Sequence, residues 1–261
     1  ETAQIMEYSS KLEVQSKALA ETAEQLREAN RKLTELSAQK DDFLSQVSHE
    51  LRTPMTSIRS FSEILRDGTK LGDEKRRHFS SIIHQESKRL TRLLDEILDL
   101  SFLESGQVQL DIRNVELSDI INQAIAATEP QLASNSVKIE RLIPQEKITI
   151  STDADRLGQV FINLISNSVK YGSSENPTIK INCTSNGKTV RIEFLDNGPG
   201  ISLEHAEQIF QKFSKFSSAS KSGSAGLGLP ISREIMKNLS GKLSHKKTKA
   251  GACFVIELPA A

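Results

Sequence analysis

The stretch Val47-Ser48-His49-Glu50-Leu51-Arg52-Thr53-Pro54 (VSHELRTP) lies inside a segment that otherwise has the apolar spacing of a long amphipathic helix. At 100° per residue, one stripe of this helix holds Leu44, Val47, Leu51, Met55, Ile58 and Leu65. His49 points to the opposite face, so it is presented to solvent or to a partner and not to a core. Pro54 lacks the N–H that would bond the carbonyl of Glu50, and we expect a kink beside the histidine. Spacing alone leaves open a solvated surface histidine.

Upstream of this stretch, apolar residues recur every seven positions between charged residues, which is the pattern of a coiled-coil seam. The seam consists of Ile5, Leu12, Leu19, Leu26 and Leu33, and Leu36 and Phe43 continue its companion position. Lys40 and Glu50 then occupy seam positions, so the hydrophobic phase slips just before His49. Either the slip transmits torque to the histidine or the segment is a plain spacer.

Downstream, after a loop over residues 66–75, a second amphipathic helix is predicted. Its apolar stripe consists of Phe79, Ile82, Ile83, Leu90, Leu93, Leu94, Ile97 and Leu100. Two helices with one stripe each cannot enclose a core, so we expect two hairpins to pair as a dimeric four-helix bundle.

The composition of the 261-residue chain excludes several classes of protein. With 34 acidic and 34 basic residues interspersed, no overall charge favours nucleic acid or an anionic membrane. Cys183 and Cys253 stand far apart, which argues against a metal cluster or a disulfide and for two buried side chains in a reducing compartment. No apolar run reaches the ~18 residues of a membrane span. Because the sequence begins at Glu1, we expect a soluble, cytoplasmic fragment that lacks an upstream module.

Glycine and proline divide the chain, because only Gly68, Gly72 and Pro54 precede position 106. Beyond about residue 108, segments with the apolar spacing of helices alternate with segments that have the apolar spacing of strands, which predicts an α+β sandwich. Helices are expected at residues 117–127, 155–171, 203–210 and 229–239. Strands are expected at 137–142, 147–151, 178–184, 189–195 and 253–258.

The predicted helix RLGQVFINLISNSVKY carries polar side chains suited to a magnesium nucleotide. Asn163, Asn167 and Lys170 share one face, and Leu157, Phe161, Leu164 and Ile165 occupy the other. Asparagine is a poor helix former, but its amide oxygen suits a hard cation, and an ammonium suits phosphate. A solvated helix face is the alternative.

Two glycine-containing loops follow. Asp196-Asn197-Gly198-Pro199-Gly200 ends a predicted strand, and although such a sequence is often a hairpin turn, a helical segment comes after it. An aspartate at a strand end can accept a hydrogen bond from a base amino group. Ser224-Ala225-Gly226-Leu227-Gly228-Leu229-Pro230 opens a helix, where free N–H groups bind anions. It matches neither the Rossmann fingerprint nor a P-loop.

The order of these motifs resembles that of the sensor histidine kinases of two-component signalling, of the HisKA family, over nearly all of residues 41–261. FLSQVSHELRTP is similar to the H box, NLISNSVKY to the N box, DNGPG to the G1 box, IFQKF to the F box and SAGLGL to the G2 box. The resemblance implies a signalling coiled coil at 1–40, a dimerisation and phosphotransfer domain at 41–105, and a catalytic ATP-binding domain of the Bergerat (GHKL) fold at 106–261.

The resemblance also implies roles for individual residues. His49 would be the phosphoacceptor, Glu50 the neighbouring base, and Thr53 part of an HExxT phosphatase motif. Asn167, with Asn163 nearby, would hold Mg²⁺, Lys170 the phosphates and Asp196 the adenine of ATP. The remaining nucleotide-site residues would be Tyr171, Gly198, Gly200, Lys215, Gly226, Leu227 and Gly228. Lys215 stands where the family often has Arg, and Ser224-Ala225 where it usually has Gly-Thr.

The implied activity is that of a homodimeric protein-histidine kinase, which phosphorylates His49 and passes the phosphoryl group to an Asp of a response regulator receiver domain. The sequence disfavours two alternative functions. A chaperone-like or topoisomerase-like ATPase has no use for an outward HELRTP helix on a two-helix hairpin. A catalytically silent scaffold has no need of intact His49, Asn167 and Asp196.

Overall fold

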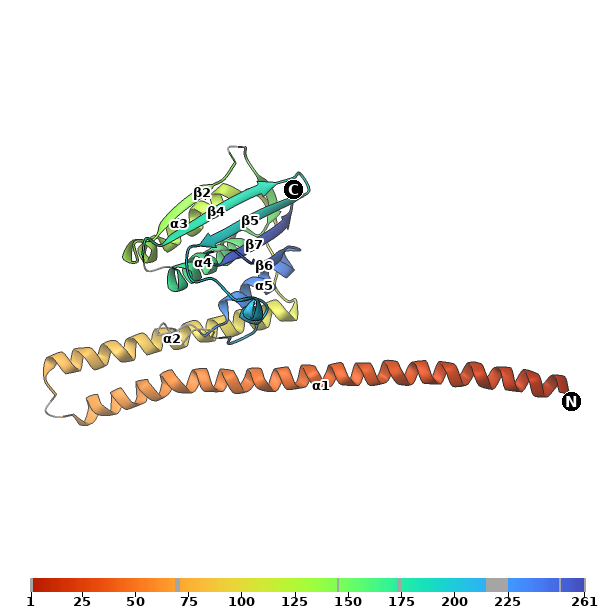
Figure 1. The fold of residues 1–261 in the computed structure, drawn as a ribbon. Coiled ribbons are helices and arrows are strands. Elements are labelled where there is room, and N and C mark those ends of the chain that lie inside the picture. Colours follow the sequence, from red (N-terminus) through yellow and green to blue (C-terminus); the bar gives the residue numbers. More distant parts are fainter. Residues whose placement is uncertain are drawn as a thin grey trace. The chain divides into compact units, whose positions relative to one another are not determined.

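The computed structural model describes residues 2–68, 71–144, 146–172, 175–214, 225–248 and 250–260, and for residues 2–14 and Leu203 it describes only the backbone. The chain divides into two compact units, Glu1–Thr53 and Pro54–Ala261, and each is described by itself. The elements are drawn in Figure 1.

The first unit is the larger part of helix α1, which runs over Thr2–Asp67 and continues through Pro54. The seam leucines Leu19, Leu26 and Leu33 are 73%, 70% and 65% exposed, and Leu36 is 60% exposed. A row of exposed leucines at heptad spacing is what an unpaired coiled-coil strand presents. The side chains of Ile5 and Leu12 lie outside the described residues. Leu44 and Met55 of the predicted stripe are also exposed, at 50% and 58%.

The second unit begins with the last turns of α1, which form a hairpin with helix α2 (Asp73–Ser105) as predicted. The rings of Phe61 and Phe79 lie 5.3 Å apart across it. Helix α2 ends where Gly106, at φ 68°, donates its backbone N–H to the carbonyl of Leu103, which is a common helix stop because glycine tolerates this conformation. None of the described helices is both long and apolar enough to span a membrane.

The rest of the second unit is an α/β domain with two sheets. The main sheet has five strands in the order β2-β4-β5-β7-β6, of which only β2 and β4 pair in parallel. They are β2 (Lys138–Leu142), β4 (Thr178–Ser185), β5 (Thr189–Asp196), β7 (Cys253–Pro259) and β6 (Lys242–Lys246). A small antiparallel sheet joins β1 (Arg113–Glu116) to β3 (Thr149–Thr152).

Helices α3 (Leu117–Ser134), α4 (Ala154–Tyr171) and α5 (Gly228–Asn238) pack along one side of the main sheet (Figure 1). The core lies between these layers, where alternate strand residues such as Ile181, Ile192 and Phe194 are fully buried. Cys183 and Cys253 are both buried and free, as predicted. The predicted α+β sandwich is therefore confirmed.

Three elements differ from the expectation. Helix α3 continues past residue 127 and Pro130 to Ser134, because its apolar stripe extends to the buried Leu132. Residues 203–210 form two short 3₁₀ helices, Leu203–His205 and Gln208–Phe210, and not one α-helix. Within the second of these only Ile209 and Phe210 are buried, which is too short a stripe for an amphipathic helix. Of β6, the sequence indicates only a solvated basic strand end at residues 245–247, and β1 was not predicted. The half-exposed pattern of β1 offers little signal.

The last turns of α2 pack against the α/β domain. Leu100 and Leu103 are 2% and 1% exposed. Asp99 accepts hydrogen bonds from Arg156 and Gln159 of α4, both at 2.8 Å. Lys212 forms an ion pair with Glu104 at 2.8 Å, and the Asn238 amide donates to the Leu103 carbonyl at 3.3 Å. Apolar burial and four polar contacts thus fix this end of α2 beside α4 and α5.

Candidate functional site

The predicted acceptor His49 lies on α1 with an exposed side chain, as expected from its place opposite the apolar stripe. Glu50 is half-buried and Thr53 is exposed. The Thr53 hydroxyl donates to the His49 carbonyl at 3.3 Å, which places these two residues one helical turn apart on neighbouring faces. An exposed imidazole offers a nitrogen nucleophile that a separate domain can reach.

Helix α4 provides the polar face that the sequence predicted. Its opposite face, with Leu157, Phe161, Leu164 and Ile165, is 0% exposed and anchors the helix in the core. At its start, Asp153 caps the helix by accepting a hydrogen bond from the Arg156 N–H at 3.0 Å. The same carboxylate accepts from the Asp111 N–H at 3.0 Å, which ties the segment after α2 to α4.

The two asparagines on the polar face are held by hydrogen bonds. The Asn163 amide donates to the Ser232 hydroxyl at 2.8 Å, and the Asn167 amide donates to the Asn163 side-chain oxygen at 3.5 Å. The Asn167 amide nitrogen is thus engaged as a donor, whereas its side-chain oxygen has no hydrogen-bond partner among the described residues. An amide oxygen on a fixed side chain is a donor type that Mg²⁺ accepts. The residue present therefore fits the ion that the resemblance implies.

Asp196 ends β5 and is 5% exposed. One of its carboxylate oxygens accepts backbone hydrogen bonds from Gly198 and Ala252, both at 2.9 Å. Two N–H donors on one oxygen fix the orientation of the carboxylate, and the other oxygen is left to accept a hydrogen bond from a ligand.

The loop after Asp196 approaches the end of α4 too closely for a side chain at Gly198. A Cβ at Gly198 would lie 2.6 Å from the Tyr171 carbonyl and 3.0 Å from the Asp196 carboxylate. Gly200 has φ 77°, where L side chains are strained. The loop is not a hairpin, since β5 pairs with β4 and β7 on its two sides.

The second glycine loop meets α4 about two turns earlier, at Asn163. Gly228 begins α5, and a Cβ there would overlap the Asn163 side chain. Gly226 has φ 76° and packs against Phe213 and Ser214, while Leu227 is fully buried. The three predicted segments therefore meet along α4, with Tyr171 and Asp196 at one end and Asn163 and Gly228 near its centre.

Lys170 completes the polar face of α4 and keeps part of its surface in contact with solvent. Partial burial of its ammonium lowers its pKa, and the positive charge of Arg92 adds to this effect, whereas the negative charge of Glu96 opposes it. Burial raises the pKa of Glu96 on α2, against the attraction of Lys170 and Arg92. Charged residues of α2 therefore influence the pKa of Lys170, the residue predicted to bind phosphate.

The predicted site residues are divided between the two units. His49, Glu50 and Thr53 belong to the first unit, and the nucleotide-site residues to the second. Lys215 and Ser224 lie outside the described residues. Two contributors were not predicted. Ser232 is a buried serine within the apolar stripe of α5, which was a usable signal. Asn197 bonds the Thr178 N–H at 2.9 Å and thereby ties the first glycine loop to β4.

Comparisons with known proteins cover both parts of the chain. Residues 39–106 match the family described as His Kinase A (phospho-acceptor) domain, and residues 152–261 match the Histidine kinase-, DNA gyrase B-, and HSP90-like ATPase family. Sensor protein kinase WalK of Staphylococcus haemolyticus is 34% identical over 231 residues, which are 86% of this chain and 37% of that protein. The chain thus spans little more than a third of that relative.

Solved structures agree in fold. Histidine kinase ThkA in complex with response regulator protein TrrA has a TM-score of 0.69 at 24% identity, covering 84% of this chain and 61% of that one. Full-length ShkA in complex with AMPPNP has a TM-score of 0.63 at 25% identity, covering 84% of this chain and 45% of that one.

Proposed function

Because this chain belongs to the sensor histidine kinases of two-component systems, we propose that it is an ATP-dependent autokinase whose acceptor is His49 and whose nucleotide site is the meeting point of α4 with the two glycine loops. The observation that carries the proposal is that the two glycine loops meet α4 at positions flanking Asn167, with the Asp196 carboxylate fixed at the start of one loop and the Asn163–Asn167 pair held beside the other. Asp196 binds the adenine amino group, Asn167 holds Mg²⁺, and Lys170 attracts the phosphates. When bound, Mg²⁺ neutralises phosphate charge.

The transfer itself needs little from the protein beyond position. A ring nitrogen of His49 attacks the γ-phosphorus, a phosphorus–nitrogen bond forms, and the bond to the bridging oxygen breaks so that ADP leaves. Glu50 orients the ring and accepts the proton that the other ring nitrogen loses. The exposed position of His49 supports this role, because the acceptor has to enter the active site of another domain.

The partners follow from the same family assignment. The exposed leucine seam supports a homodimer, whose two hairpins form the four-helix bundle. The phosphoryl group then passes to an Asp of a response regulator receiver domain, and Thr53 supports a phosphatase step on that regulator. The solved complex of ThkA with the response regulator TrrA is a precedent in fold for such a partner. An upstream sensor module would supply the signal.

The test is incubation of the chain with γ-labelled ATP and Mg²⁺, followed by exposure of the labelled protein to acid and to alkali. Phosphohistidine loses its label in acid and keeps it in alkali. We expect His49→Gln to abolish the label while ATP binding persists, and the matched variant His84→Gln, at an exposed histidine of α2, to keep it. Acid-labile label in His49→Gln would place the acceptor elsewhere.

Two further variants test the nucleotide site independently of the acceptor. Asn167→Asp and Asp196→Asn should each weaken binding of Mg²⁺–ATP, measured by calorimetry, with little change in the unfolding midpoint. The control Asn186→Asp lies in the β4–β5 turn, where its side-chain oxygen accepts backbone hydrogen bonds that a carboxylate can also accept. Unchanged ATP affinity in both site variants would disprove the assignment of the site.

A further inference from the structure

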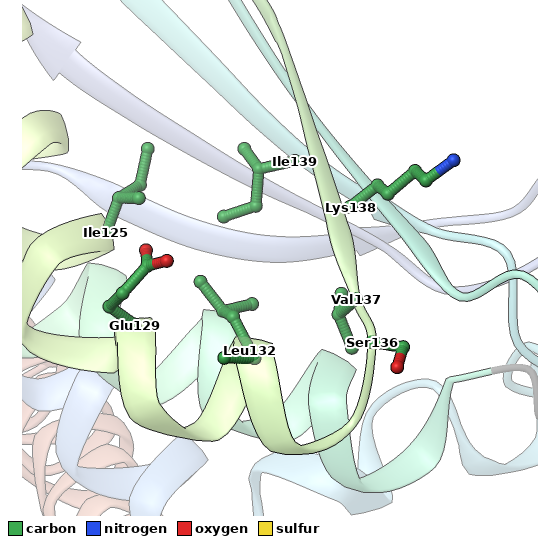
Figure 2. Close-up of a pocket in the computed structure, with 8 residues that line it drawn as sticks. Ile125, Glu129, Leu132, Ser136, Val137, Lys138 and Ile139 are labelled. Atoms are coloured by element: carbon green, nitrogen blue, oxygen red, sulfur yellow. The ribbon is translucent and has the colours of Figure 1, made fainter.

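A groove lies between α3 and the edge strand β2, and none of its lining residues belongs to the nucleotide site (Figure 2). Its volume is about 440 Å³, within the range of roughly 300 to 1,000 Å³ that ligand sites occupy. The apolar lining comes from Ile125 and Leu132 of α3, from Val137 just before β2, and from Ile139 of β2. Ile125, Val137 and Ile139 are each only half-buried. The groove therefore offers apolar surface that the described part of the chain leaves uncovered.

Strand β2 has one free side along this groove. It is at the end of the strand order and pairs only with β4 in the described part of the chain. In a parallel pair, the N–H and C=O of one residue point to the same neighbour, and successive residues alternate. The Lys138 N–H bonds the Pro177 carbonyl, so Lys138 and Glu140 face β4. The backbone groups of Ile139 and Arg141 consequently point outward, where they can pair with another strand.

A single charge lies among the apolar side chains. The Glu129 carboxylate points into the space between α3 and β2, beside Ile125, Leu132 and Ile139, whereas the Lys138 ammonium points away from it (Figure 2). Glu129 has no ion-pair or hydrogen-bond partner among the described residues. A ligand that covered the groove would have to supply a cation for this carboxylate, because a covered and unpaired charge is costly.

From these three observations we propose that the groove binds an extended segment of a partner protein, which pairs with β2 as an added strand. Residues directly opposite each other in a sheet project to the same face. The segment's residue opposite Ile139 therefore projects over α3, and so does every second residue from it. The chemistry of the groove requires apolar side chains at these positions and one lysine or arginine that reaches Glu129. This is binding by strand addition, in which backbone bonds give affinity and alternate side chains give selectivity. It is an activity separate from phosphotransfer.

The test uses blocked six-residue peptides with a fluorescent label and the whole chain, with binding followed by anisotropy. The first probe alternates threonine with valine, lysine and valine, so that the last three project over α3. The second probe replaces its lysine by glutamate. The third keeps the lysine but carries N-methyl groups on the amides that would face β2. We expect saturable binding of the first probe and at least tenfold weaker binding of the third.

Two pairs of variants assign the contacts. Glu129→Gln should weaken binding of the lysine probe by roughly twofold to fivefold, the effect of losing an exposed ion pair. Glu129→Lys should make the chain bind the glutamate probe more tightly than the lysine probe. Arg141→Pro removes an outward N–H but none that bonds β4, and should abolish binding. Its matched control, Arg141→Ala, loses the same side-chain bond to Asn122 but keeps the N–H, and should bind normally. Thermal unfolding of each variant verifies that it is folded.

Three results would overturn the proposal. Equal binding of the N-methylated probe would mean that apolar side chains enter the groove without strand addition. No saturable binding of the lysine probe by the folded chain would mean that β2 is only a solvent-exposed edge. A change of oligomeric state in Arg141→Pro, seen by sedimentation in the absence of peptide binding, would assign the edge to a second copy of the chain.

Discussion

Asp99 of α2 accepts a 2.8 Å hydrogen bond from the guanidinium of Arg156 in the first turn of α4, although the two residues are 57 positions apart. The side chains are only 21% and 28% exposed, and Gln159 donates to the same carboxylate. Because Arg156 also follows the capping residue Asp153, the pair links the end of α2 directly to the start of the helix that carries the nucleotide-site asparagines.

The first prediction is that Asp99 and Arg156 stabilise the chain as a pair. A double-mutant cycle of Asp99→Ala and Arg156→Ala, measured by urea unfolding, should give a coupling free energy of about 0.5 to 1.5 kcal/mol. The control is Asp95→Ala, at an exposed aspartate one turn earlier on α2. It should lower the free energy of unfolding by less than either single variant does. Strictly additive single effects would show that the hydrogen bond contributes nothing.

The second prediction concerns the pH dependence of stability. Burial raises the pKa of Glu96 in the folded chain, so the folded state holds this proton to higher pH than the unfolded state does. The stabilisation that the protonated Glu96 carboxyl provides is fully present below the pKa that Glu96 has in the unfolded chain. It is lost as the pH rises through the pKa that Glu96 has in the folded chain. Glu96→Gln should therefore be no more stable than the wild type at pH 4 but more stable at pH 7, as measured by urea unfolding. An equal difference at both pH values would contradict this.

The third prediction separates two glycines near α4. Gly228→Ala should weaken Mg²⁺–ATP binding, because a Cβ there overlaps the Asn163 side chain and displaces it. Gly158→Ala is the control, since its Cβ would meet only the Ile120 side chain at 3.7 Å, and it should stabilise the helix by roughly 0.5 to 1 kcal/mol. Calorimetry and thermal unfolding measure the two effects. Unchanged affinity in Gly228→Ala would show that the second loop tolerates the displacement.

The sequence predicts those features that depend on residues close together in the chain, and it does not predict contacts between distant segments. The two faces of α4 follow from helical spacing alone, and the structure confirms them down to the full burial of Phe161 and Leu164. The resemblance implied that Gly198, Tyr171, Gly228 and Asn163 share one site, but the contacts of Gly198 with Tyr171 and of Gly228 with Asn163 were not predicted, because no local pattern encodes contacts over such distances. Nothing in the local sequence distinguishes Asp99 and Arg156 from solvated charges, since their burial arises only when α2 packs on α4. The groove beside β2 was not predicted for the same reason.

The fourth prediction uses the phase slip near Lys40. If the leucine seam transmits its rotation to the His49 segment, inserting one to seven residues beside Lys40 should change the ratio of kinase to phosphatase activity with a period of about seven residues. Both activities would be measured with labelled ATP and with purified phosphorylated regulator. A ratio that merely decays with the length of the insert would identify the segment as a spacer.

The last prediction concerns Thr53, whose hydroxyl donates to the His49 carbonyl at 3.3 Å within α1. That bond is long, and the side chain is exposed, so the hydroxyl is free to rotate toward a docked partner. There it would position a water molecule against the phosphorylated aspartate of the regulator. Thr53→Ala should therefore keep autophosphorylation and forward transfer but slow dephosphorylation of the purified phospho-regulator by about tenfold or more, since general acid–base and positioning groups contribute on the order of 10²-fold.

The control for this variant is Thr56→Ala, which removes a threonine from the same outward face of α1 and should leave the dephosphorylation rate unchanged. Thr53→Ser would keep the hydroxyl and should retain most of the activity, because serine can also donate and accept at this position. Circular dichroism of all three variants would exclude a general loss of helix. If Thr53→Ala dephosphorylated the regulator as fast as an active wild type, the hydroxyl would serve only the helix, through its bond to the His49 carbonyl.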